Sequence, residues 1–288
     1  MPSSAAPRYL LGDAGIHRLI QGRAGWFLYN RHDVYIGGAL ERYGEYGQIE
    51  ADLLAQLVRP GDVAIEVGAN IGSLTVGLAK AAGSSGRVIA FEPQRVVFQT
   101  LCANVALNSL TWVDTVHAAV GLRPGNVMIA EPDYAKPGNF GGVEVIAPRA
   151  NTASLPDKVE PVTLLTLDDF YRGDHLRLIK VDVEGMEQDV LEGASRLLSD
   201  LRPMLYVEND RRDQSAALIR TIGSFGYVCY WHLPFLYNPD NWFGESENLY
   251  PGTVSVNMLC LPDEMPSNIS GLARADDPDF HPLAHLQK

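Results

Sequence analysis

The strongest constraint on the fold is a regular alternation of short apolar runs with helical patterns, which begins near residue 63. Residues 63–67 and 88–91 are typical of buried strands, and each run is followed by apolar residues at helical spacing. Residues 178–181 and 204–207 repeat the arrangement later in the chain. Because parallel neighbours need a crossover connection, usually a helix, the alternation predicts a mostly parallel sheet with helices on both faces.

Three other stretches complete the predicted α/β fold. Residues 115–120 are expected to form a third strand of the same sheet. Residues 122–162 are rich in Gly, Pro and Asn and predict an inserted hairpin on the ligand side. Residues 227–231 and 254–260 are strand-like runs with no helical pattern between them, so we expect them to pair antiparallel at one edge of the sheet.

The chain divides into three parts. Residues 1–48 contain short apolar runs, such as residues 33–36, and predict a cover or hairpin extension with no core of its own. Residues 49–261 carry the alternating pattern and form the main domain. Residues 262–288 are rich in Pro and Asp, and we expect a loose tail.

Composition narrows the classes of partner. The 288 residues carry a net charge of -12, which disfavours nucleic acid and anionic membrane surfaces as default partners. Three widely separated cysteines fit neither a disulfide framework nor a thiolate metal site and are typical of a reducing compartment. We therefore expect a cytoplasmic protein without a membrane span.

A glycine turn follows the first strand of the main domain. Gly68 and Gly72 bracket the turn that leads into a helix, where backbone N–H groups and the helix N-terminus attract a ligand. Glu92 stands twenty residues after Gly72, at the end of the next strand, where an acid can accept hydrogen bonds from ribose hydroxyls. The pair predicts a nucleoside ligand, although a purely structural turn is the alternative. A valine at position 68 would then be expected to block the ligand and spare the fold.

The turn lacks two glycines of the dinucleotide fingerprint. Asn70 and Ser73 stand where that fingerprint requires glycine, so a pyrophosphate would lack room. A phosphate-free ligand such as S-adenosylmethionine fits better, with its ribose at Glu92. A nucleotide-dependent oxidoreductase or epimerase remains the rival enzyme class.

Three segments resemble the motifs of one family. Residues 65–72, 90–93 and 179–187 are similar to hallmark motifs of the FkbM family of S-adenosylmethionine-dependent methyltransferases. The resemblance covers about residues 26–261. It implies a seven-stranded class I methyltransferase sheet whose last strand is antiparallel. It also implies an enzyme that methylates hydroxyl groups of sugars, glycans or natural products; a non-catalytic protein that binds the cofactor is the alternative.

The resemblance also assigns the cofactor site. Glu66, where the family usually carries aspartate, would contact the ammonium group of the cofactor, and Glu92 would hold its ribose. Ala119 and Val120 would face the adenine. The full set of cofactor residues expected from the resemblance is Glu66, Gly68, Asn70, Gly72, Phe91, Glu92, Gln94, Ala119, Val120 and Asp182.

Acidic residues follow the fourth and fifth strands. Asp182 and Glu184 follow one strand, and Glu208 and Asn209 end the next. Because ligands of open parallel sheets bind outside the carboxyl ends of the strands, these side chains should share one crevice with Glu92. Asp182, Glu208 and Asn209 are oxygen ligands of the kind that Mg²⁺ prefers, but we do not expect a metal to be required. The simpler alternative is that Glu208 caps a helix or pairs with a neighbouring arginine.

The same crevice supplies the candidate catalytic residues. Asp182 is expected to orient or deprotonate an acceptor hydroxyl, with Glu184 as the other acidic candidate. His232 is a candidate base because the ordinary pKa of histidine suits proton removal at neutral pH. The expected partner is a small molecule or glycan that bears a hydroxyl group.

Overall fold

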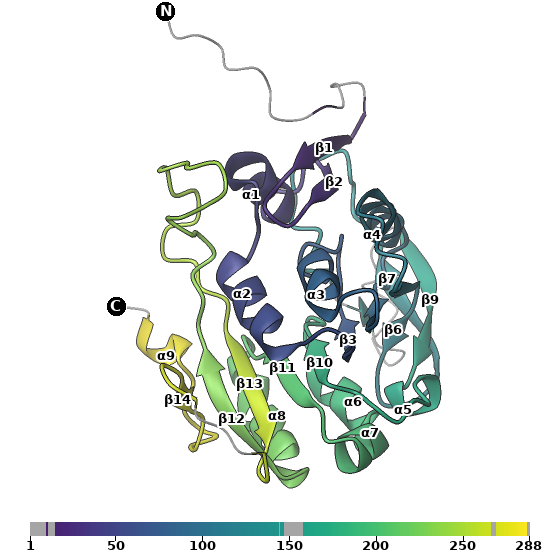
Figure 1. Cartoon of the computed structure of the whole chain (residues 1–288), viewed down its shortest axis with the longest axis vertical. Helices are drawn as coiled ribbons and strands as arrows, with labels where there is room; N and C mark the ends of the chain where they lie inside the picture. Colours follow the sequence, from purple (N-terminus) through teal and green to yellow (C-terminus); the bar gives the residue numbers. More distant parts are fainter. Residues whose placement is uncertain (1–9, 11–14, 144, 147–157, 266–268, 287–288) are drawn as a thin grey trace, which may run out of the picture.

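The core of the molecule is one twisted sheet, shown in Figure 1. The structure is a computed structural model that describes residues 10, 15–143, 145–146, 158–265 and 269–286. The strands of the main sheet are β3 (Val63–Val67), β4 (Arg87–Phe91), β5 (Val113–Val116), β10 (Leu178–Val181), β11 (Met204–Glu208), β12 (Tyr227–His232), β13 (Asn257–Pro262) and β14 (Ala273–Arg274). In the described residues the sheet has eight strands in the order β14-β12-β13-β11-β10-β3-β4-β5.

The strand directions confirm the predicted fold class. Strands β11, β10, β3, β4 and β5 pair in parallel. Strand β13 is antiparallel to both of its neighbours, β11 and β12, as the edge pattern predicted. Seven of the strands therefore form the predicted sheet with an antiparallel last strand, and β14 is an additional edge strand.

Two apolar layers explain why the central strands are buried. Successive side chains of a strand point to opposite faces, so Ile65 and Ile179 belong to one apolar cluster and Ala64 and Leu178 to the other. Both faces are covered by helices, which is why these strands carry nearly continuous apolar runs.

The covering helices divide between the two faces. Helices α2 (Gln48–Leu57) and α3 (Thr75–Ala82) contribute to the cluster that contains Ala64. Helices α6 (Glu187–Glu192), α7 (Ser195–Asp200) and α8 (Arg212–Ser224), with the short α5 (Leu167–Phe170), contribute to the cluster that contains Ile65. Within the described residues, no helix combines the length and the apolar character needed to cross a membrane.

The N-terminal segment forms a hairpin and a helix at the top of Figure 1. Strands β1 (His17–Gln21) and β2 (Trp26–Asn30) pair antiparallel. The side chain of Asn104, in α4 (Arg95–Leu107), accepts a hydrogen bond from the Leu28 N–H at 2.6 Å and donates one to the Leu28 carbonyl at 2.9 Å. The side-chain amide therefore replaces a strand neighbour and fixes the hairpin to the main domain.

Residues 33–36 are not the expected strand. Helix α1 begins at Ile36 and runs over Ile36–Tyr43. The carboxylate of Asp33 accepts hydrogen bonds from the N–H groups of Tyr35, at 2.9 Å, and Ile36, at 3.1 Å. These contacts satisfy backbone donors at the start of a helix, so the local polar cap overrides the strand-like pattern.

The predicted strand at residues 115–120 is also wrong as one element. Strand β5 ends at Val116, and the Ala118 N–H bonds the Val116 carbonyl at 3.1 Å, which turns the chain. Strand β6 (Ala119–Val120) then joins a separate sheet with the order β6-β9-β7-β8. The other members are β7 (Gly125–Ala130), β8 (Val145–Ile146) and β9 (Val159–Leu165), which pair antiparallel on both sides of β7.

The described part of the C-terminal segment is not a loose tail. Strand β14 pairs antiparallel with β12, and the Ala275 N–H bonds the Cys229 carbonyl at 2.9 Å. The ring of His281 is buried and hydrogen-bonds the Asn209 carbonyl at 2.9 Å, shortly before α9 (Leu283–Leu286). The segment thus satisfies the backbone groups of an otherwise open sheet edge, which a composition argument does not detect.

Candidate functional site

A cavity of about 450 Å³ opens at the carboxyl ends of the parallel strands. Its volume lies in the range of small-molecule and cofactor sites. The loops after β3, β4, β10 and β11 line it, together with residues of the insertion and residues 253–257. The predicted site residues that line the cavity are Glu66, Gly68, Asn70, Glu92, Gln94, Ala119, Val120, Asp182, Glu184 and Glu208.

Glu92 follows β4 and lines the cavity, where it is held by two backbone groups. Its Oε2 accepts a hydrogen bond from the Asn70 N–H at 2.9 Å, and its Oε1 accepts one from the Gln94 N–H at 2.8 Å. Burial raises the pKa of this carboxyl to about 7, against the two backbone hydrogen bonds that lower it. Both oxygens keep a lone pair for a ligand, so the carboxylate is oriented before anything binds.

The glycine turn has a structural role that the sequence analysis did not foresee. Gly68 has φ of 83°, and a Cβ at this position would lie 1.7 Å from the backbone oxygen of Asp182. The missing side chain therefore makes room for the neighbouring strand end, not for a ligand alone. The expectation that Gly68→Val would spare the fold is wrong for this reason.

Lys180 is the centre of a buried ionic cluster. The strand register places it beside Glu66, and its Nζ lies 3.9 Å from Glu66 Oε1 and 3.0 Å from Asp182 Oδ2. The Thr75 hydroxyl donates to Glu66 at 2.6 Å. Burial alone would lower the lysine pKa, but the carboxylates of Asp182, Glu66 and Glu50 hold it above its ordinary value. Lys180 is therefore charged and neutralises part of the acidic site.

Asp182 and Glu208 form a carboxyl pair. Val181 pairs with Val207, so the next residues of the two parallel strands, Asp182 and Glu208, lie side by side. Burial raises the pKa of Glu208 well above its ordinary value, and the neighbouring carboxylates of Asp182 and Asp210 raise it further. Burial and the neighbouring carboxylates therefore favour the protonated form of Glu208.

Glu184 lies beside this pair at the cavity wall. It has φ of 56°, an unusual backbone conformation for a glutamate, and its Oε2 lies 3.2 Å from Arg211 Nη2. Burial, followed by repulsion from Asp182 and Asp210, raises its pKa to about 7. The arginine opposes this shift and fixes the direction of the side chain.

A turn of the insertion reaches the cavity. Asn139, Gly141 and Gly142 line it. The side-chain amide of Gln94 donates to the Phe140 carbonyl at 2.7 Å, and the Asn139 side chain accepts from the Gly141 N–H at 3.1 Å. Gln94, predicted as a cofactor residue, therefore also holds this turn in place.

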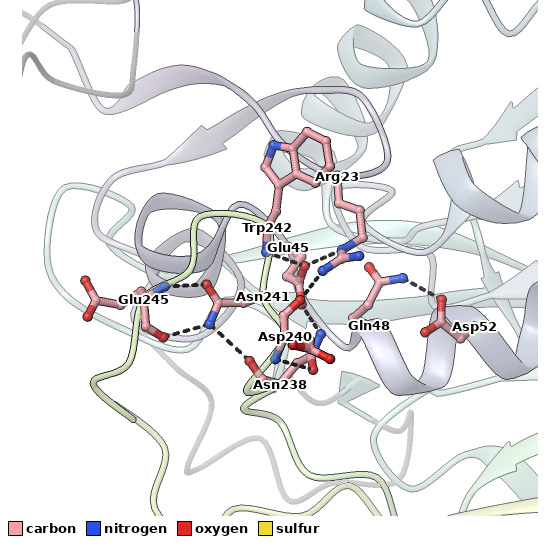
Figure 2. A network of polar contacts seen from close by, with 9 residues as sticks. All are labelled: Arg23, Glu45, Gln48, Asp52, Asn238, Asp240, Asn241, Trp242 and Glu245. Carbon is pink, nitrogen blue, oxygen red and sulfur yellow. Dashed lines mark hydrogen bonds and ion pairs between the residues drawn. The ribbon is translucent and has the colours of Figure 1, made fainter.

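A second wall comes from the loop between β12 and β13. Figure 2 shows the polar network that fixes this loop to the N-terminal segment. The buried carboxylate of Glu45 accepts hydrogen bonds from the Asn238 side chain at 2.7 Å and from the Trp242 N–H at 2.9 Å, and pairs with Arg23 at 2.5 Å. The network holds the loop between β12 and β13. The end of this loop, residues 253–257, lines the cavity.

Four predicted residues do not line the cavity. Phe91 is in the core against Phe170, and Gly72 packs against Leu101. His232 is buried and its Nδ1 lies 2.7 Å from the Tyr206 hydroxyl, while burial lowers its pKa, so the structure does not place it as a base. Asn209 is buried outside the cavity, and its amide nitrogen donates toward Met258 Sδ at 3.4 Å.

The described residues do not form a recognisable metal site. No group of three His, Cys, Asp or Glu side chains there is placed to hold an ion. Asn209, the amide of the predicted set, does not line the cavity with Asp182 and Glu208.

Two buried charges were missed by the sequence analysis. Lys180 interrupts a continuous apolar strand, and a buried lysine requires carboxylate partners. Glu50 precedes Leu54 by four residues on the apolar stripe of its helix and is buried at the cavity. The burial of both residues could have been predicted, because each is an ionisable residue at a position where the apolar spacing predicts a core residue.

Comparison with known proteins decides the family. The model of the methyltransferase FkbM domain matches residues 66–229, more than half of the chain. The chain belongs to the FkbM methyltransferase family. Membership of this family implies S-adenosylmethionine as the cofactor, and the matched residues contain the glycine turn, Glu92, Lys180 and the carboxyl pair.

Individual relatives are distant. A ribosomal RNA small subunit methyltransferase A from Streptomyces coelicolor is 29% identical over 62% of this chain and 53% of its own length. A solved FkbM methyltransferase from Methylobacillus flagellatus is 18% identical with a TM-score of 0.46, over 73% of this chain and 50% of that chain. A solved S-adenosylmethionine-dependent O-methyltransferase from Thermotoga maritima is 13% identical with a TM-score of 0.44, over 87% and 79% of the two chains. The chain spans about half the length of the first two proteins.

Proposed function

We propose that this chain transfers a methyl group from S-adenosylmethionine to a hydroxyl oxygen of a small molecule or glycan. The observation that carries the proposal is the Asp182–Glu208 carboxyl pair at the wall of a cavity whose other end holds the glycine turn and Glu92. A proton acceptor beside a cofactor site is the arrangement that methylation of an oxygen needs.

The residues present fit the cofactor. Glu92 is buried, oriented by two backbone N–H groups and able to accept from both ribose hydroxyls. Ala119 and Val120 offer apolar surface at the same end of the cavity for an adenine ring. S-adenosylmethionine carries a sulfonium and an ammonium against one carboxylate, so its net positive charge matches a wall rich in acids.

In this proposal the residues that follow β10 and β11 remove the proton of the acceptor hydroxyl. A sulfonium is a strong methyl donor when bound, so the protein mainly orients the acceptor and accepts its proton. Lys180 donates a hydrogen bond to the Asp182 carboxylate at 3.0 Å and fixes its position. Asp182 then accepts the hydroxyl proton as the acceptor oxygen takes the methyl group, and Glu208 lies beside it at the end of the adjacent strand. Glu184, turned by Arg211, orients the acceptor.

The proposed reaction needs no divalent metal. Asp182 and Glu208 line the cavity but Asn209 does not, so the three residues do not form a set of oxygen ligands there. Turnover that is unchanged by EDTA is expected, whereas activity lost in EDTA and restored by Mg²⁺ would contradict this part of the proposal.

The deciding experiment separates binding from transfer. Calorimetry with S-adenosylmethionine tests the cofactor site, and transfer of an isotopically labelled methyl group to a metabolite and glycan extract tests the reaction. We expect binding and label on an oxygen atom, with Asp182→Asn keeping the binding and losing the label. Binding without label in any fraction would indicate a non-catalytic cofactor-binding protein, and label on nitrogen or carbon would refute the hydroxyl acceptor.

A further inference from the structure

We propose that Glu50, on helix α2, binds the ammonium group of S-adenosylmethionine. The inference rests on the cofactor of the proposed function and assigns a residue to one of its charged groups. The resemblance to the family gives that contact to Glu66. Two observations favour Glu50: the Glu66 carboxylate has partners inside the protein, and the Glu50 carboxylate has none among the described residues.

Both oxygens of Glu66 have partners within the protein. The Glu66 side chain is 1% exposed. Its Oε2 accepts a hydrogen bond from the Thr75 hydroxyl at 2.6 Å, and its Oε1 lies 3.9 Å from the Nζ of Lys180. A ligand ammonium would have to displace the lysine or approach a carboxylate with almost no accessible surface. Glu66 therefore belongs to the buried ionic cluster, and the cofactor ammonium is left to another acid.

Glu50 is buried at the cavity and lacks a partner there. The residue is 7% exposed and lines the cavity. In the part of the chain that the structure describes, its carboxylate forms neither a hydrogen bond nor an ion pair. Protein atoms do not enclose the oxygens of Glu50, in contrast to Oε2 of Glu208. A carboxylate buried to this degree is costly without a donor, so the missing partner is expected on a ligand in the cavity.

The charges around Glu50 leave room for a cation. Burial raises the pKa of Glu50 to about 7, Lys180 lowers it, and Asp182 and Glu66 raise it. Lys180 forms its ion pairs with Asp182 and Glu66, at 3.0 and 3.9 Å, and not with Glu50. A ligand cation beside Glu50 would compensate the charge that the lysine leaves unpaired.

Glu50 lies at the end of the cavity that holds the glycine turn. A Cβ on Gly47 would lie 3.8 Å from Glu50 Oε2 and 3.7 Å from Leu74 Cδ2, so both groups lie next to the same point of the backbone. Leu74 directly precedes α3, and both Ser73 and Leu74 line the cavity. The Glu50 carboxylate is therefore close to the segment that joins the glycine turn to α3.

The start of α3 offers the complementary group. Among the described residues, the N–H groups of Ser73 and Leu74 have no acceptor. Free N–H groups at a helix N-terminus bind anions. The methionine part of the cofactor carries its carboxylate on the same carbon atom as its ammonium. A carboxylate at the start of α3 thus brings the ammonium close to Glu50, and an amino-acid zwitterion matches both groups.

Calorimetry with two ligands tests the assignment. S-adenosylhomocysteine has the ammonium and carboxylate of the cofactor without its sulfonium, and the deamino analogue of S-adenosylhomocysteine lacks only the ammonium. We expect the wild-type protein to bind the deamino analogue at least about tenfold more weakly. Glu50→Gln should weaken the binding of S-adenosylhomocysteine by a similar factor. It should also reduce the difference between the two ligands to less than about threefold.

Two control variants locate the effect. Glu66→Gln removes a carboxylate of the buried ionic cluster, and we expect it to keep the difference between the two ligands. Asp52→Asn removes a charge at an exposed position of the same helix as Glu50, and it should leave both affinities unchanged. The comparison of the two ligands on the wild-type protein needs no variant, so it does not depend on how well a variant folds.

The outcomes separate the inference from the proposed reaction. A difference between the ligands that survives in Glu50→Gln, or that disappears in Glu66→Gln, overturns the assignment and leaves methyl transfer to a hydroxyl intact. Equal binding of both ligands by the wild-type protein also overturns it. A difference that depends on Glu50, together with label on nitrogen or carbon, supports the assignment and refutes the hydroxyl acceptor. Binding of neither ligand overturns both proposals.

Discussion

Replacing Lys180 by methionine tests the ionic cluster at the centre of the site. The lysine side chain is 2% exposed and Glu66 is 1% exposed, so their charges compensate each other with almost no solvent screening. Removing one partner of a buried pair costs about 3–5 kcal/mol because the other charge stays buried. We therefore expect Lys180→Met to lose a free energy of unfolding of that size near neutral pH.

The loss should depend on pH. Burial already raises the pKa of Glu66 and raises that of Glu50 to about 7, and Lys180 opposes both shifts. Without the lysine, both carboxyls titrate at still higher pH in the folded state than in the unfolded state. Such groups stabilise the fold when protonated, and this contribution is lost as pH rises through the folded pKa. The variant should therefore be nearer to wild type at pH 5 than at pH 8.

Denaturant unfolding at these two pH values measures both effects. The matched control is the double variant Lys180→Met with Glu66→Gln, which removes both partners and should recover much of the loss. A loss below about 1 kcal/mol at pH 8, or a loss that does not change with pH, would show that the cluster is not the buried charge pair described above.

Three further predictions concern the cofactor turn and the base. Glu92→Ala should weaken S-adenosylmethionine binding at least tenfold, since it removes two charge-assisted hydrogen bonds of about 1.5–3 kcal/mol each; unchanged calorimetric affinity in a folded variant would refute the assignment. Gly68→Ala should lower Tm markedly, because its Cβ would lie 1.7 Å from the Asp182 oxygen; an unchanged Tm would contradict the geometry. Asp182→Asn should slow turnover by about 10²–10⁴-fold with cofactor affinity kept, and a rate within a few-fold of wild type would exclude it as the base.

Local patterns were sufficient for the main sheet. Runs such as 63–67 and 178–181 are apolar because both sheet faces are covered, and that requirement is written into consecutive residues. Local sequence patterns did not predict the secondary structure where one polar contact, or pairing with a distant strand, determined it. Asp33 accepts hydrogen bonds from the N–H groups of Tyr35 and Ile36 at the start of α1, and β14 forms because the edge of β12 is available for pairing.

The site shows the same division. Residues that follow strands, such as Glu92 and Asp182, could be placed at the cavity from sequence because strand ends determine their position. The contacts of Gly68 and His232 could not be predicted from their positions relative to strand ends. Gly68 faces the backbone of Asp182, and His232 bonds Tyr206, and each of these contacts joins segments far apart in the chain.

The fold class, the family motifs and the acids at the strand ends could all be predicted from the amino-acid sequence, since each depends on residues that are close neighbours along the chain. The three-dimensional structure was needed to show that Asp182 lies beside Glu208, that Lys180 neutralises Glu66, and that Asn209 lies outside the cavity. The physical reason is strand register: pairing Val181 with Val207 sets which charges meet, and it depends on packing of the whole sheet.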